Sequence, residues 1–84
     1  MNTGLQFTGS LGPNASQRWF THGWNAALHV VWYVTPTSPQ SGAPQLEWST
    51  AVERASDTQC TYWVTVKNLT GSNITFEVRY AILS

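Results

Sequence analysis

The chain has 84 residues, of which 42% are apolar and five are tryptophan. Its four basic and four acidic side chains cancel to a formal net charge of zero at pH 7. This balance argues against nucleic acid or an anionic membrane as a partner, because both require a basic footprint. We expect a single small domain spanning residues 1–84, which at this size buries only about 60% of its unfolded surface.

The start of the chain carries neither the charged nor the apolar region of a signal peptide, and no segment is long enough to span a bilayer. We therefore expect no membrane insertion, and a protein that is cytoplasmic or released by a non-classical route. The single cysteine, Cys60, allows no internal disulfide.

Three segments of the N-terminal half have the character of strands. Residues 5–8 form a short alternating edge strand, closed by turn-forming residues 9–14. Residues 17–24 place Phe20, His22 and Trp24 on one parity and Trp19, Thr21 and Gly23 on the other. Residues 28–34 alternate with Leu28, Val30, Trp32 and Val34 inward. We expect these segments to form one sheet.

Residues 35–44 contain three prolines and a glycine, which predicts an extended loop that carries the chain to a second sheet. Residues 45–54, 60–67 and 74–83 then alternate between apolar and polar positions. Such alternation predicts strands with one buried and one solvated face. We expect these three strands to form the second sheet.

The turns predict the register of this second sheet. A loop over residues 55–59 places Glu47 opposite Lys67, and that opposite-charge pair supports the register. Leu69, Thr70 and Gly71 fit a hairpin loop whose last position needs positive φ, with Asn68 and Asn73 as flanking turn residues. That hairpin would set Trp63 opposite Glu77, and Thr61 opposite Arg79.

The expected fold class is all-β: a small antiparallel β-sandwich or flattened barrel of about six strands, with Greek-key or meander connections. No stretch shows a 3.6-residue apolar period, so almost no helix is expected.

The first candidate site is the solvated face of the second sheet around Trp63. An indole surrounded by hydroxyls and charges suits a sugar, because the ring stacks on C–H groups while polar side chains reach the hydroxyls. The alternative is a subunit interface, since aromatic residues and Arg also mark interface centres. The residues expected around Trp63 are Ala51, Thr61, Thr65, Glu77 and Arg79.

The second candidate site is the aromatic group between Trp19 and Tyr33. It either fills the core or forms a pocket at one end of the sandwich. In the pocket interpretation, Trp19 or Trp24 stacks on a ligand while His22, Asn25 or Arg18 donates hydrogen bonds.

We expect no metal, no cofactor and no enzymatic activity. His22 and His29 lack the cysteine or carboxylate companions that zinc requires. Cys60 shares the parity of buried residues, where a thiol is inert. Glu53 and Glu77 would lie on an open, wet sheet, which does not provide the raised pKa that acid–base catalysis uses.

No motif identifies a family, and the likeness of the chain to small lectins is an analogy of composition and expected fold class. We therefore expect a carbohydrate-binding module that binds a glycan or other small polar ligand and acts as a small homo-oligomer. The alternative is a non-catalytic structural or assembly module whose aromatic face is a subunit interface. The candidate binding residues are Trp63, Glu77, Arg79, Thr65, Trp19, His22, Trp24 and Asn25.

Overall fold

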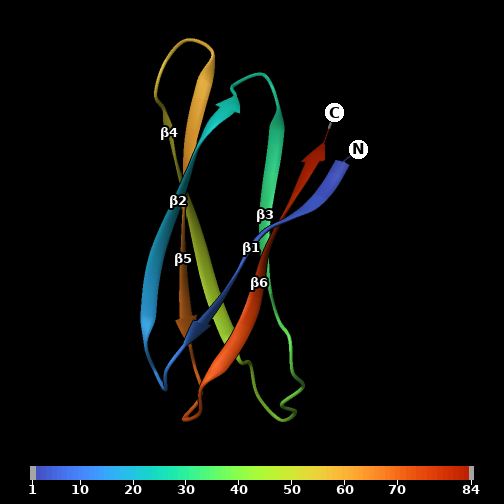
Figure 1. Ribbon diagram of the computed structural model, residues 1–84, viewed down its shortest axis with the longest axis vertical. Helices are drawn as coiled ribbons and strands as arrows, with labels where there is room; N and C mark the ends of the chain where they lie inside the picture. Colours follow the sequence, from blue (N-terminus) through green and yellow to red (C-terminus); the bar gives the residue numbers. More distant parts are fainter. Residues whose placement is uncertain (1, 84) are drawn as a thin grey trace.

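A computed structural model describes residues 2–83 and shows six strands in two facing sheets (Figure 1). The expected all-β sandwich is confirmed, and residues 2–83 contain no helix. Within that range there is accordingly no helix that could cross a membrane. The strands are β1 (Asn2–Leu11), β2 (Ser16–Asn25), β3 (His29–Pro36), β4 (Leu46–Arg54), β5 (Gln59–Asn68) and β6 (Ile74–Leu83).

The strands are distributed between the sheets differently from the sequence-based expectation. One sheet has the order β1-β6-β3 and the other β2-β5-β4, with antiparallel pairing throughout. The β4–β5 hairpin is confirmed, with Glu47 opposite Lys67. The grouping of the last three strands in one sheet was wrong, because β6 pairs with β1 and β3 in the opposite sheet.

The connection from β5 to β6 is an arch between the sheets and not a hairpin. Gly71 does not have the positive φ that the hairpin required, and among residues 2–83 that conformation occurs at Asn14, Gly23 and Gly42. Alternation could not distinguish the two arrangements. In a hairpin the apolar parities of both strands point to one side, whereas in an arch they face each other, and the sequence pattern is the same.

Asn68 fixes this arch from inside the molecule. Its side chain is fully buried, and Nδ2 donates to the carbonyl oxygens of Leu11 (3.2 Å), Gly12 (2.9 Å) and Ser72 (2.7 Å). Its Oδ1 accepts hydrogen bonds from the backbone N–H and the hydroxyl of Thr70. The side chain therefore ties the β5–β6 arch to the β1–β2 connection at the same end of the sandwich.

Strand β1 is longer than the predicted residues 5–8 and contains a bulge at Gln6. The bulge shifts the alternation by one residue. Gly4, which precedes the bulge, faces inward, and so do Phe7, Gly9 and Leu11, which follow it. The two glycines make room for aromatic rings on β6. A Cβ at Gly9 would lie 2.8 Å from the Phe76 ring, and one at Gly4 would meet Tyr80.

The core lies between the sheets and draws on both of them. Its fully buried centre is formed by Val64 and Val66 of β5 facing Phe76 and Val78 of β6. The expected inward set of β3 is confirmed for Val30, Trp32 and Val34, which pack in or against this core. The loop between β3 and β4 is largely exposed and crosses from one sheet to the other, as its prolines predicted.

Candidate functional site

The solvated face of the β2-β5-β4 sheet carries the most exposed aromatic side chain of residues 2–83. Alternation along β5 turns Val64 and Val66 inward, so Trp63 and Thr65 face outward. The register places Phe20 of β2 and Ala51 of β4 on either side of Trp63. Phe20 is 66% exposed, the largest exposed fraction among the large apolar side chains of residues 2–83.

Four side chains on this face form a continuous row, called here the aromatic row: Arg18, Trp63, Phe20 and His22. The Arg18 guanidinium carbon lies 5.4 Å from the centre of the Trp63 ring. The Phe20 ring centre is 6.5 Å from Trp63 and 6.4 Å from His22, with ring planes inclined by 37° and 30°. Phe20 and His22 therefore lie next to each other with moderately inclined rings, and the Arg18 cation lies over the Trp63 ring.

Polar groups border the aromatic row along β4 and β5. Thr65 stands between Arg18 and Ser49, and Glu53 stands opposite Thr61, which was expected on the open face but is buried. A shallow hollow of about 180 Å³ adjoins this end of the face. It is lined by Ser16, Glu47, Trp48, Ser49, Thr65 and Lys67. The face thus combines open rings with hydroxyl, carboxylate and ammonium groups.

Trp63, Thr65 and His22 were among the binding residues predicted from the sequence, whereas Phe20, the exposed ring, was not. The reason is a bulge in β2, where His22 and Gly23 together oppose one residue of β5. Gly23 has a φ of 81°, a conformation that glycine adopts without steric cost. Gly23 within an alternating segment was the available signal, because an isolated glycine in a strand often marks a bulge.

The bulge also moves Trp24 to the inward face, together with Trp19. Trp19 packs against Phe7 and Phe76, with ring centres 5.3 and 5.7 Å apart. Trp24 donates from Nε1 to the Thr21 hydroxyl at 3.1 Å. The expected grouping of Trp24 with Phe20 and His22 was therefore wrong, and both tryptophans belong to the core.

Four aromatic rings meet at one end of the sandwich: Trp24, Trp32, Tyr62 and Tyr80. The Trp24 centre lies 5.2 Å from both Trp32 and Tyr80, and the Trp32 centre lies 5.6 Å from Tyr62. Rings this close touch each other, so these four side chains pack as one cluster, and Trp32 and Tyr62 also line a hollow between β3 and β4. Burial, together with nearby Cys60, raises the pKa of Tyr62 above its ordinary value.

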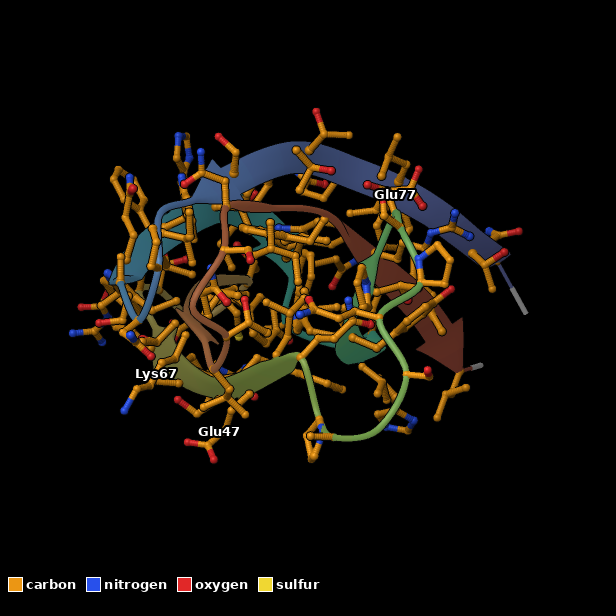
Figure 2. All side chains as sticks on the ribbon, turned by 90° about the horizontal axis from the view of Figure 1, so that it is seen from below. Glu47, Lys67 and Glu77 are labelled. Carbon is orange, nitrogen blue, oxygen red and sulfur yellow. The ribbon has the colours of Figure 1, made fainter. Side chains whose placement is uncertain are left out.

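Glu77 and Arg79 lie on the opposite sheet, so the expected pairs Trp63–Glu77 and Thr61–Arg79 are wrong. Figure 2 shows Glu77 across the molecule from Glu47 and Lys67. Glu77 and Arg79 form an ion pair with each other on the outside of β6. The pKa of the Arg79 guanidinium is raised, mainly by its hydrogen bond to Glu77 and to a smaller extent by Tyr33. These residues form a separate polar surface.

Asn25 acts in the turn between β2 and β3. Its Oδ1 accepts a hydrogen bond from the Ala27 N–H at 2.9 Å, and its carbonyl accepts one from the Leu28 N–H. This is a local turn that Asn side chains commonly form. The structure thus assigns Asn25 a conformational role and separates it from the aromatic row.

The titratable residues are scattered over both sheets. His22 lies on β2 and His29 on β3, and Glu53 and Glu77 likewise lie on different sheets. Among residues 2–83, no three His, Cys, Asp or Glu side chains gather into a group that could hold a metal ion. Cys60 is buried.

Comparison of the chain with models of protein families, with curated proteins and with solved structures finds no match. The functional argument therefore rests on the residues of this chain.

Proposed function

We propose that the protein is a carbohydrate-binding module whose ligand lies along the aromatic row. The observation that supports this most is the exposure of Phe20 beside Trp63 on a face that is otherwise polar. A pyranose ring has apolar C–H faces that stack on aromatic rings and hydroxyls at its edge that need partners. An exposed ring bordered by hydroxyls and charges meets both requirements.

In this proposal each residue of the face has a defined part. Phe20 offers its open ring to the sugar, and Trp63 continues the stacking surface toward Arg18. Arg18 and His22 donate hydrogen bonds at the two ends of the row, because guanidinium and imidazole N–H groups suit hydroxyl oxygens. Thr65 and the adjoining hollow offer hydroxyl and charged groups to a second sugar residue.

A subunit contact is the second candidate for the same face. Aromatic and Arg side chains that lie together are typical of the centres of protein interfaces. The two candidates differ in what removal of a ring does. Removing a ring that stacks on a glycan leaves the oligomeric state of the protein unchanged. Removing a ring at a subunit interface dissociates the oligomer and lowers the mass measured in solution.

The experiment is a glycan array followed by titration of the bound sugar into the protein, monitored by tryptophan fluorescence. Phe20→Ala should weaken binding about tenfold or more, equivalent to about 1.4 kcal/mol. Trp63→Ala should also weaken it, and Leu5→Ala, which removes an exposed apolar side chain from the other sheet, should not. Absence of glycan binding, with Phe20→Ala sedimenting at a lower mass than the parent, would assign the face to subunit contact.

A further inference from the structure

Strand β4 is exposed on both of its faces, unlike its partner β5. Trp48 and Val52 have the parity of the inward face, yet they are 41% and 62% exposed. The facing strand β3 approaches β4 to within 8 Å between Cα atoms but does not pair with it. A hollow of about 300 Å³ between them is lined by residues that include Val30, Trp32, Val52 and Tyr62.

The middle of the free edge of β4, residues 48–52, carries none of the charges, bulges or prolines by which natural proteins protect sheet edges, because its charged residues Glu47, Glu53 and Arg54 lie toward its two ends. Its register with β5 runs from Leu46 to Arg54 without a bulge. The strand also contains no proline, glycine or lysine. Each of the other three edge strands carries such a device: a bulge in β1, a bulge in β2 and Pro36 at the end of β3.

We propose that β4 pairs antiparallel with β4 of a second copy, about a two-fold axis at Ala51. The partner is therefore another molecule of this chain, and the two β2-β5-β4 sheets join into one continuous sheet. This proposal does not depend on glycan binding. Two-fold symmetry makes the interface self-complementary, so the charges of β4 decide which register is possible.

The charges select the register centred on Ala51. An axis perpendicular to the sheet keeps each face on its own side, so residues of equal parity must pair. Centring on Thr50 would set Glu47 opposite Glu53 of the second copy, twice by symmetry, and like charges directly opposite are destabilising. Centring on Ser49 gives a ladder of the same length as centring on Ala51, but it leaves two charged residues, Glu53 and Arg54, without an opposite residue in the second strand, whereas centring on Ala51 leaves only one, Glu47.

The register centred on Ala51 has complementary neighbours on both faces. On the inward face, Trp48 lies opposite Arg54 of the second copy, so a guanidinium meets an indole at each end of the ladder. Arg54 is held at the strand end by a hydrogen bond from Nη2 to the Asp57 carbonyl. On the same face Thr50 lies opposite Val52 of the second copy. This pairing covers Val52, which is more exposed than Trp48 in the single chain.

Cysteine cross-linking tests this geometry. Directly opposite residues of an antiparallel pair have Cα atoms about 4.5–5.5 Å apart, within the range of about 4.4–6.8 Å that disulfides span. Ala51→Cys should therefore form a disulfide-linked dimer under mild oxidation. Ser49→Cys should not, because the two copies of residue 49 would be offset by about 14 Å along the strands. The native Cys60 is buried and does not compete.

Sedimentation supplies the second measurement. The parent protein should sediment at twice the chain mass at low micromolar concentration, and Val52→Lys should sediment as a monomer. Leu5→Lys, an equivalent change at an exposed site on β1, should remain dimeric. A monomeric parent would overturn the proposal. Stronger cross-linking of Ser49→Cys or Thr50→Cys than of Ala51→Cys would also overturn it.

Discussion

Asn68 shows how a single buried amide can specify a connection between sheets. Its two donors and one acceptor are used by backbone and hydroxyl groups of two separate turns. Buried polar groups without partners cost about 1–3 kcal/mol each, so this network stabilises one arrangement of the turns and penalises others. Although Asn68 begins an Asn-X-Thr triplet, its side chain is fully buried.

Replacing Asn68 with Asp tests this network at nearly constant shape. The carboxylate would face the three carbonyl oxygens that Nδ2 now contacts, so we expect a loss of about 3 kcal/mol or more at pH 7. Burial among acceptors raises the pKa of the new carboxyl above its unfolded value of about 3.9. The folded variant then binds more protons than the unfolded chain, so its stability falls as pH rises from about 4.

Urea unfolding between pH 3 and pH 8 measures this effect. The control is Asn73→Asp, because Asn73 is exposed at the other end of the same arch. The control should show neither the loss nor the pH dependence. An Asn68→Asp variant as stable as the parent at pH 7 would contradict the role assigned to this amide.

At the scale of the elements, the two glycines of β1 let the edge strand lie close to β6. Gly9 pairs with Phe76 and Gly4 with Tyr80, and each ring lies over the neighbouring glycine. The edge strand thus gives up side-chain packing of its own so that large rings of the central strand fit beneath it. This arrangement compensates for the low strand propensity of glycine.

Gly9→Ala should destabilise the protein by about 1–3 kcal/mol, because the new methyl group would overlap the Phe76 ring. Gly71→Ala is the matched control. Gly71 has open space around its Cβ position and no positive φ, so we expect a change within about 0.5 kcal/mol. Thermal or urea unfolding of both variants measures the difference. A large loss for Gly71→Ala would instead support the hairpin that the sequence suggested.

At the scale of the whole molecule, the pairing of β1 with β6 joins the two ends of the chain. Asn2 lies opposite Ile82, and β4–β5 is the one hairpin between consecutive strands among residues 2–83. Most strand pairs therefore join residues far apart in the sequence, so the entropy of closing a long loop opposes each pairing during folding. Proteins with such non-local pairing fold slowly.

We expect refolding from urea to occur in milliseconds to seconds, as in other β-sandwiches of high contact order. Stopped-flow tryptophan fluorescence measures the rate, since Trp19, Trp24 and Trp32 pack in or against the core. Folding complete within microseconds would contradict the non-local topology.

Alternation along the chain predicted the approximate positions of the strands and the inward parity of β3, β4, β5 and β6, but it did not predict that β1 extends over Asn2–Leu11 or that Trp48 and Val52 are exposed. A period-two pattern with one apolar face is a local property, so it can be read without knowing which strands are neighbours. The short loop between β4 and β5 also predicted their register, which the opposite charges of Glu47 and Lys67 supported, and the structure confirms that these two residues lie opposite each other. These features required only local information.

Tertiary structure alone decided the pairing of strands and thus the composition of the candidate site. The same alternation of β5 and β6 suits a hairpin or an arch, and the choice depends on Asn68 and on distant residues of β1 and its turn. The bulges at Gln6 and at His22 and Gly23 then reversed the parity of β1 and β2. One extra residue exchanges the two faces of a strand, so it put Phe20 in solvent and Trp24 in the core.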